Sequence, residues 1–303
     1  MKQISPDKLL ASIRNKLKHY SSAWTPKSYL QVDEDLVNVL GRPDYGIPYG
    51  CLIELSGAEQ SGKSALALSL LAQAQADGAY GIWLDAENSL DEQWATRRGV
   101  DWDKLYKIRP YVGVFGTKDG KKRRLTSAQE LCSEFEQVIE RVTTLCEKHG
   151  TDFKFFGVVD SLTALLTADE LNAGLEGQNM RTQLSLPAYL GKLLRRWVGM
   201  CQSYNATILF VNQLRVDPTQ RFGNPEYEPG GKATKFYCHI RARMKRGKGG
   251  GVMQNSSKQI GIKGTIRNVK NKTGGVEKIA CGYKIFWKGH VKFVTAEALD
   301  KGE

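Results

Sequence analysis

Short apolar runs alternate with amphipathic or helix-favouring stretches over most of the chain. The apolar runs have the length of buried β-strands and occupy residues 51–56, 80–85, 155–160 and 206–212. The stretches between them have the spacing or composition of helices and occupy residues 64–76, 90–98, 125–150 and 184–204. Strands that alternate with helices predict βαβ units. We therefore expect an α/β fold, with a mostly parallel, twisted sheet covered by helices on both faces.

The two ends of the chain show other patterns. Residues 7–20 place apolar side chains at helical spacing, residues 33–40 form a second amphipathic stretch, and 41–50 hold three glycines and two prolines. This predicts a short N-terminal helical segment followed by a loop. From Phe236 onward, strand-like runs predict an antiparallel extension at one edge of the sheet, with a hairpin tip at Gly249–Gly251.

Composition excludes several classes of protein. The 303 residues are 41% hydrophobic and 9% aromatic, which excludes a disordered or collagen-like chain. No apolar run reaches the length of about 18 residues that a membrane span needs, and the first ten residues lack the apolar core of a secretory signal. The six cysteines form no CxxC pair, which argues against a zinc ribbon or a redox motif. Scattered thiols suit a reducing compartment, so we expect a cytoplasmic protein.

The positive charge is concentrated in two places. Lys and Arg number 44 against 32 Asp and Glu, a net charge of +12. The segment from Lys232 to Lys272 holds twelve basic residues and no acidic one, and Lys121–Arg124 reads KKRR. This asymmetry favours a polyanionic partner, with a merely solvated basic face as the alternative.

Residues Gly57–Ser64 read GAEQSGKS and match the phosphate-binding pattern G-x-x-x-x-G-K-[ST] between a predicted strand and a predicted helix. The loop amides and the helix N-terminus would bind phosphates. Lys63 would reach the β- and γ-phosphates, and the Ser64 hydroxyl would bind Mg²⁺. The alternative is a glycine-rich turn with a surface lysine.

Two carboxylates are positioned to complete such a site. Asp160 ends the apolar run FFGVVD, where ligands of open α/β sheets bind, and would support the metal. Glu87 follows another strand end, in WLDAENSLD, and would orient or deprotonate the attacking water. For Glu87, Asp85 and Asp91 the alternative is an acid that stabilises a helix N-terminus.

Together, these motifs make a family recognisable. GAEQSGKS, DAENSLD, VVDS, FVNQLR and FGNPEYEPGGKATKFYCHIR occur in that order. From about Gly50 to Trp287 the chain resembles the RecA recombinase family, cellular or phage-borne, and 212–236 is the most specific part. The resemblance implies a P-loop NTPase core that uses ATP and Mg²⁺. It also implies a helical filament on single-stranded DNA that pairs this strand with homologous duplex and hydrolyses ATP when DNA is bound.

The resemblance also implies roles for single residues. Glu87 would be the catalytic carboxylate, Asp160 would support Mg²⁺, and Trp94 would lie against adenine with Asp91 and Trp287 near it. The phosphate loop would consist of Gly57, Ala58, Glu59, Gln60, Ser61, Gly62, Lys63 and Ser64.

Three further residues would connect this site to DNA and to the next subunit. Gln213 would sense the γ-phosphate and pass its presence to the DNA-binding loop that follows. Lys270 and Lys272, in VKNK, would reach into the neighbouring subunit's ATP. The alternatives are a polar residue at a strand end for Gln213 and a basic edge strand for the two lysines.

Two loops are expected to contact DNA, residues 171–180 and 214–230. The first loop is glycine-rich and polar, whereas the basic and aromatic side chains of the second suit sequence-tolerant single-strand binding, with an ordinary surface loop as the alternative. The candidate DNA contacts are Met180, Arg181, Arg215, Arg221, Phe222, Gly223, Asn224, Tyr227, Gly230 and Gly231.

The chain departs from bacterial members of the family, which carry a separate C-terminal lobe and an acidic tail. We expect an N-terminal helix and linker in 1–45 that docks on another protomer, a core in 46–290, and a short tail in 291–303 without that lobe. In place of the lobe, we expect Arg243, Lys245 and Arg246 to form a basic gateway for duplex DNA. The expected partners are single-stranded and duplex DNA, further copies of the chain, and single-strand-binding and mediator proteins, with no membrane.

Two other functions share this core. A hexameric motor or helicase would more commonly show an arginine finger in place of the VKNK lysines. A catalytically reduced DNA-binding paralogue is disfavoured by the intact Lys63, Ser64, Glu87 and Asp160.

Overall fold

A mixed sheet lies at the centre of the molecule. The computed structural model describes residues 24–117, 120–173, 179–216, 226–227, 229, 232–254 and 258–301. Among these residues the main sheet has nine strands in the order β15-β14-β13-β12-β3-β9-β8-β4-β5. Its strands are β3 (Leu52–Gly57), β4 (Tyr80–Asp85), β5 (Leu105–Ile108), β8 (Phe155–Asp160), β9 (Ala206–Gln213), β12 (Ile240–Gln254), β13 (Lys258–Asn271), β14 (Ala280–Phe286) and β15 (Val291–Thr295).

The sheet has a parallel half and an antiparallel half, as the sequence predicts. Strands β12, β3, β9, β8, β4 and β5 all pair in parallel. Strands β13, β14 and β15 continue from β12 in antiparallel pairs. The predicted α/β fold class, with an antiparallel extension at one edge, is confirmed.

Two details of the extension differ from the prediction. Residues Phe236 and Tyr237 belong to the short helix α9 (Ala233–Tyr237), not to a strand. The predicted hairpin tip at Gly249–Gly251 is wrong, because β12 continues to Gln254 and the pairing register with β13 shifts between Arg246 and Gly251. Gly249 and Gly250 have positive φ angles of 70° and 21°, so the glycines form an irregularity inside the strand.

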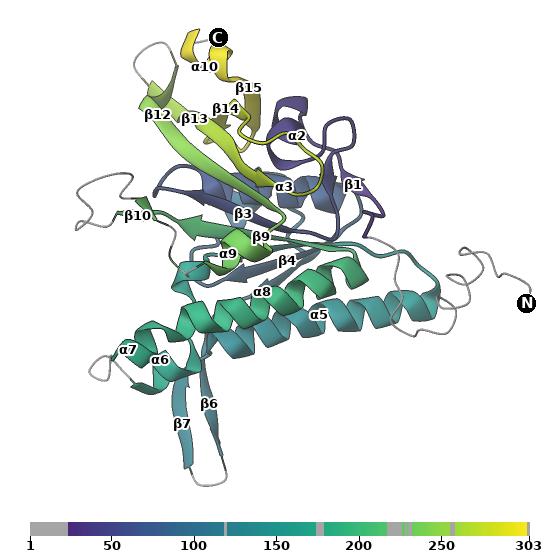
Figure 1. Cartoon of the computed structure of the whole chain (residues 1–303), viewed down its shortest axis with the longest axis vertical. Helices are drawn as coiled ribbons and strands as arrows, with labels where there is room; N and C mark the ends of the chain where they lie inside the picture. Colours follow the sequence, from purple (N-terminus) through teal and green to yellow (C-terminus); the bar gives the residue numbers. More distant parts are fainter. Residues whose placement is uncertain are drawn as a thin grey trace, which may run out of the picture.

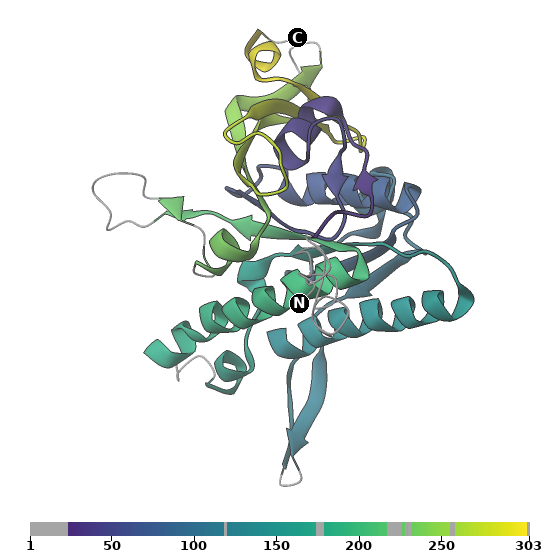
Figure 2. The same cartoon turned by 45° about the vertical axis from the view of Figure 1, so that its right-hand side comes forward.

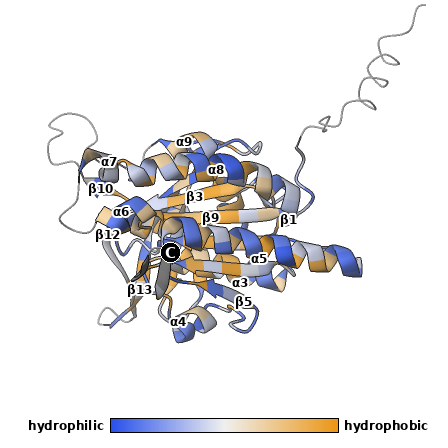
Figure 3. Ribbon diagram, turned by 90° about the horizontal axis from the view of Figure 1, so that it is seen from below, coloured by the Kyte–Doolittle hydropathy of each residue, from blue (hydrophilic) through white to orange (hydrophobic). Residues whose placement is uncertain are grey.

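Helices cover both faces of the parallel half. Helix α3 (Lys63–Ala76) packs on one face, and the long helices α5 (Ala128–His149) and α8 (Ser185–Tyr204) lie side by side on the other (Figure 1). Seen from below, apolar strands lie between helices whose outer faces are hydrophilic (Figure 3). Because strand side chains alternate, each strand serves both faces: Ile53 and Leu55 join the α3 side, and Leu52 joins the α5–α8 side.

The helix boundaries follow from local signals in the sequence. Ser127 caps α5 and forms a capping box with Glu130, and Gly150 ends the helix at φ 64°. The described chain before β3 contributes β1 (Tyr29–Leu30), α2 (Glu34–Leu40) and β2 (Ile47–Pro48). Leu36 and Leu40 of α2 are buried in the core cluster on the α3 side. The helix predicted in residues 7–20 lies outside the described residues.

A hairpin that the sequence pattern does not predict extends from the parallel half. It consists of β6 (Val112–Thr117) and β7 (Gly120–Leu125), and it projects away from the body in both Figure 1 and Figure 2. The helices α6 (Ala168–Ala173) and α7 (Met180–Gln183) lie beside its base. None of the described helices has the length and apolar character that a membrane crossing requires.

A buried ion pair joins β3 to β12, the strand from which the antiparallel extension continues. Glu54 of β3 and Arg241 of β12 are both buried, and Arg241 Nε donates to Glu54 Oε2 over 2.5 Å. Asn212 of β9 donates to the other carboxylate oxygen over 2.8 Å. Three adjacent strands therefore share one desolvated carboxylate, whose burial is compensated by these two donors.

We predict that Arg241→Met destabilises the fold by about 3–5 kcal/mol, because it leaves the Glu54 carboxylate buried without its cation. Urea denaturation measures the loss. The control Lys245→Met removes an exposed cation from the same strand and should change stability by less than about 0.5 kcal/mol. Adding Glu54→Gln to Arg241→Met should recover part of the loss. An Arg241→Met variant as stable as its parent would contradict this role.

Candidate functional site

Four parallel strands end at the same edge of the sheet and bring the predicted chemistry together. Gly57 ends β3, Asp85 ends β4, Asp160 ends β8 and Gln213 ends β9. Neighbouring pairs in register include Asp85 with Asp160 and Gly57 with Gln213. This edge is where ligands of open α/β sheets bind.

The predicted phosphate loop joins β3 to α3. Gly62 is the N-cap of α3 at φ 89°, a left-handed conformation that glycine adopts without strain. Lys63 is only 7% exposed, and its ammonium donates to the carbonyls of Gly57 and Ala58 over 3.0 and 2.8 Å. Burial lowers the pKa of Lys63, while the nearby charges of Asp160, Glu87 and Glu59 act in the opposite direction. The ammonium of Lys63 is therefore enclosed by the loop backbone, where a bound anion would stabilise its charge.

The antiparallel extension supports this loop from behind. The Tyr283 hydroxyl of β14 donates to the Ser61 carbonyl over 2.6 Å, and the Ser61 hydroxyl donates to the Ala58 carbonyl over 2.7 Å. A Cβ atom on Gly57 would lie 2.5 Å from the Met244 carbonyl oxygen of β12. The loop is thus shaped by β12 and β14 as well as by its own sequence, and Tyr283 was not among the predicted site residues.

Asp160 and Ser64 lie together beneath the loop. Burial raises the pKa of Asp160 to about 6, the Ser64 hydroxyl hydrogen bond opposes this shift, and the charges of Glu87 and Asp85 add to it. A buried carboxylate beside a serine hydroxyl offers the hard oxygen ligands that Mg²⁺ binds together with phosphates and water. The residues present therefore fit the metal that the sequence predicts.

Glu87 is held by two donors at one oxygen atom. The Ser161 hydroxyl donates to Glu87 Oε1 over 2.5 Å, and the Gln213 side-chain amide donates to the same oxygen over 2.9 Å. Asp85 accepts from the backbone amides of Ser89 and Leu90 and so shapes the turn that carries Glu87. Ser161 was not predicted, although its position directly after Asp160 could have indicated it.

A cavity of about 540 Å³ adjoins the phosphate loop. Trp94 of α4 (Glu92–Arg97) and Trp287 face each other there with ring centroids 6.5 Å apart, as expected for a base-binding region. Arg246 also lines the cavity, 3.4 Å from the Gln60 side chain. Asp91 caps α4 by accepting from the Trp94 amide over 2.7 Å.

Lys270 and Lys272 lie away from the phosphate loop of their own chain. Lys270 pairs with Arg241, which pairs with Glu54, three residues before Gly57 in β3. Its ammonium donates to the carbonyls of Lys235 and Phe236 in α9 over 2.6 and 3.2 Å. Burial, followed by the charge of Lys272, lowers the pKa of Lys270. Lys272 is exposed.

The predicted DNA loops are described in part. Arg215 of β10 (Arg215–Val216) pairs with Tyr227 of β11 (Glu226–Tyr227), and both are exposed. Met180, 77% exposed, begins α7, which also contains Arg181. The other predicted contacts lie outside the described residues: Arg221, Phe222, Gly223, Asn224, Gly230 and Gly231.

A basic cleft of about 690 Å³ lies on the antiparallel extension. Its cationic lining residues are Arg243, Lys245, Arg267 and Lys278. Of the three residues predicted as a gateway, two line this cleft, whereas Arg246 lines the cavity beside the phosphate loop. Lys278 and Arg267 were not predicted as site residues, although both lie in or near the basic segment.

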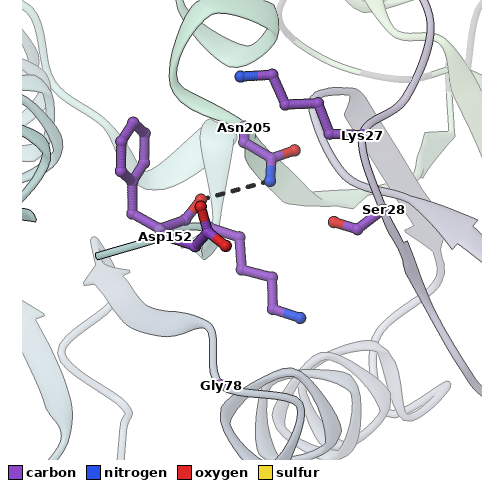
Figure 4. Close-up of a pocket in the computed structure, with 7 residues that line it drawn as sticks. Lys27, Ser28, Gly78, Asp152 and Asn205 are labelled. Carbon is purple, nitrogen blue, oxygen red and sulfur yellow. Dashed lines mark hydrogen bonds between the residues drawn. The ribbon is translucent and has the colours of Figure 1, made fainter. Parts of the chain in front are cut away.

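A further cavity has a volume of about 360 Å³ (Figure 4). Gly78 and Asn205, which line it, come just before β4 and β9, so the cavity lies at the amino ends of these strands, opposite the phosphate loop. Lys27, Ser28, Asp152 and Asn205 surround it, and the Asn205 amide donates to the Phe153 carbonyl over 3.4 Å. None of the residues lining this cavity was predicted as part of a site.

Comparison with known proteins places these features in a family context. A family model described as the RecA N-terminal domain matches residues 35–117 and 126–289. The chain is 35% identical to Protein RecA of Aquifex pyrophilus over 228 residues, which cover 75% of this chain and 56% of that protein. It is 30% identical to Protein RecA of Campylobacter hominis over 258 residues, 85% of this chain and 65% of that protein. The chain thus spans roughly three-fifths of the length of these relatives.

We predict that affinity for Mg²⁺–ATP falls as the pH drops below about 6, because Asp160, with its pKa raised to about 6, then loses its charge. Calorimetric titration across the acidic range measures this affinity. Asp160→Asn should bind Mg²⁺–ATP weakly at every pH, without the fall in affinity near pH 6.

The raised pKa of Asp160 also means that the folded state keeps a proton that the unfolded chain releases, so Asp160 lowers the stability of the fold as pH rises from about 4 to 6. Asp160→Asn should therefore raise the thermal midpoint near pH 8 and change it little near pH 4. An unchanged midpoint at both pH values would contradict the burial of this charge.

Proposed function

The chain belongs to the RecA family, and on this basis we propose that it is an ATP-dependent DNA recombinase. It would form a helical filament on single-stranded DNA, promote homologous pairing and strand exchange, and hydrolyse ATP when DNA is bound. The observation that carries the proposal is the shared Glu87 oxygen, which accepts from both Ser161 and Gln213. Gln213 directly precedes the predicted DNA loop 214–230, so the predicted catalytic carboxylate is bonded to the residue next to that loop.

The residues of the site support a division of labour in ATP hydrolysis. The Lys63 ammonium would exchange its two loop carbonyls for phosphate oxygens, which relieves the unfavourable burial of its charge. Mg²⁺, held by Ser64 and Asp160, would neutralise phosphate charge. Glu87 would orient the attacking water and accept its proton. Trp94 and Trp287 would bracket the base.

Gln213 is positioned to couple nucleotide to DNA. Its amide can donate to Glu87 Oε1 or to a γ-phosphate oxygen, and a switch between the two would move the end of β9. Strand β10 starts two residues later, so this movement would reach Arg215 and Tyr227 directly. Binding of a γ-phosphate would thereby change the position of Arg215 and Tyr227, and with it the affinity of this loop for DNA.

We assign single-stranded DNA and duplex DNA to different surfaces of the protein. The loops around Met180 and Arg215 would hold single-stranded DNA through cations and apolar side chains. The basic cleft around Arg243, Lys245 and Arg267 would receive duplex DNA. Within residues 1–45, the part that precedes β1 would dock on the neighbouring protomer, because Leu36 and Leu40 of α2 are buried in the core of their own chain.

We predict that Glu87→Gln reduces ATP turnover on single-stranded DNA by about 10²–10⁴-fold, because an amide cannot act as a general base. ATP binding and filament formation should survive, and filaments should last longer. Lys63→Ala is the matched comparison, since losing the main phosphate cation should remove nucleotide binding itself. Electron microscopy with a slowly hydrolysed ATP analogue identifies the assembly. Closed rings in place of helical filaments would reject the recombinase in favour of a hexameric motor.

We further predict that Lys270 and Lys272 act on the ATP of an adjacent protomer, because they lie away from their own phosphate loop. Lys272→Ala is the cleaner variant, since Lys270 also holds α9 carbonyls. By analogy with residues supplied in trans, its turnover should fall by about 10³-fold or more, while ATP affinity of the unassembled chain stays unchanged. Mixing Lys272→Ala with Lys63→Ala protein should restore part of the activity, since some interfaces pair an intact loop with an intact lysine. Mixed filaments that form on DNA but stay inactive at every ratio would contradict action in trans.

A further inference from the structure

The β6–β7 hairpin departs from the domain that the family model describes. The match covers residues 35–117 and resumes at 126, so it omits 118–125. The omitted stretch contains the whole of β7, Gly120–Leu125. The return strand of the hairpin is therefore a feature of this chain that the matched family domain does not account for.

The return strand carries an unusual concentration of positive charge. Lys121, Lys122, Arg123 and Arg124 follow one another in β7, opposite residues 113–116 of β6, which are uncharged. Residues 112–125 as a whole hold five basic residues and one acidic residue. Such a cationic ribbon is complementary to a polyanion.

The base of the hairpin is firmly held. The Thr126 amide and hydroxyl both donate to the Tyr111 carbonyl, over 3.0 and 2.9 Å, and the Tyr111 amide donates back to the hydroxyl over 3.2 Å. Arg124 forms a two-pronged ion pair with Glu130 in the first turn of α5, with distances of 2.9 and 3.0 Å. These contacts fix the direction in which the hairpin leaves the body.

The first turn of α5, which follows this base, is bonded to the segment that precedes a predicted DNA loop. The Ala128 amide donates to the Leu166 carbonyl over 2.7 Å, and the Ala168 amide donates to the Gln129 side chain over 3.0 Å. Leu166 and Ala168 lead into α6 and then to Met180, and α6 and α7 lie beside the hairpin in Figure 1. The hairpin therefore stands next to α6 and α7, which contain the two ends of the loop expected to hold single-stranded DNA.

Exposed apolar side chains accompany this charge at the base. Tyr111 is 56% exposed and Val112 66% exposed, and Leu125, paired with Val112, is also exposed. Cations next to an exposed aromatic ring and aliphatic side chains match the surfaces on which nucleic acid strands lie, with phosphates on the cations and bases or sugars on the apolar groups.

We propose that the β6–β7 hairpin is an additional DNA-binding arm, whose return strand contacts the sugar–phosphate backbone of DNA held at the neighbouring loop. The inference rests on the proposed DNA-binding function and adds a contact surface to it. The consecutive basic residues of β7 supply the positive charge for this contact, and Arg124 anchors the arm through Glu130.

The test compares three full-length proteins in their binding to a fluorescein-labelled oligo-dT strand, with a slowly hydrolysed ATP analogue present. The first is unchanged, the second carries Lys121→Gln, Lys122→Gln and Arg123→Gln, and the third is a control with three exposed cations removed elsewhere. The control substitutions are Arg141→Gln, Lys148→Gln and Lys292→Gln. For single strands each phosphate contact adds about 0.7 to the slope of log K against log salt, so losing three contacts should flatten the slope by about 2. Affinity near physiological salt should fall roughly tenfold, and the control should behave like the unchanged protein.

The outcomes separate this inference from the proposed function. If the unchanged protein binds DNA in an ATP-dependent way but the hairpin variant keeps its salt slope and affinity, the DNA arm is rejected and the recombinase proposal stands. If the hairpin variant instead changes self-association in sedimentation without DNA, and its salt slope stays the same, the arm contacts another copy of the chain. If the unchanged protein binds no DNA, the proposed function itself fails. Equal losses in the hairpin variant and the control would mean that only net charge matters, which also rejects the arm.

Discussion

The parallel alignment of β3, β9, β8 and β4 is the constraint on which the rest of the structure depends. Parallel pairing places the carboxyl ends of all four strands at one edge, although they are far apart in the chain. This edge brings the Lys63 cation, the Asp160 carboxylate and the Glu87–Gln213 pair into one region. A slip of one residue in any pairing would turn these side chains towards the opposite face of the sheet, so the apolar core that sets the register also sets the site.

Desolvated charge gives this site its chemistry. Burial lowers the pKa of Lys63 and raises that of Asp160 to about 6, so each group lies in an environment that disfavours its charged form. Phosphate and Mg²⁺ are the ligands that would relieve these two penalties together. The Glu54–Arg241 pair follows the opposite logic, because its charges already compensate each other inside the protein. One sheet thus contains a satisfied buried pair that links β3 to β12 and a less satisfied cluster suited to binding.

Strand β12 separates two surfaces by its two-residue period. Met244 lies against the phosphate loop and Arg246 lines the cavity beside it, whereas Arg243 and Lys245 line the basic cleft. A single basic run in the sequence is therefore divided between a nucleotide-facing surface and a second cationic surface. The β6–β7 hairpin adds a third concentration of positive charge, held at a different edge of the molecule by Thr126 and Arg124.

The sequence by itself determined the alternation of strands and helices, the phosphate loop and the ends of α5, because each depends on neighbouring residues. The capping Ser127, the terminal Gly150 and the GAEQSGKS pattern are local signals of this kind. Only the tertiary structure decided which distant groups meet. It placed Ser161 and Gln213 on one oxygen of Glu87, Tyr283 behind the loop and Arg246 apart from Lys245, and it extended β12 past Gly249–Gly251. These outcomes depend on strand register and on the order of strands in the sheet, which arise from packing between segments that are remote in sequence.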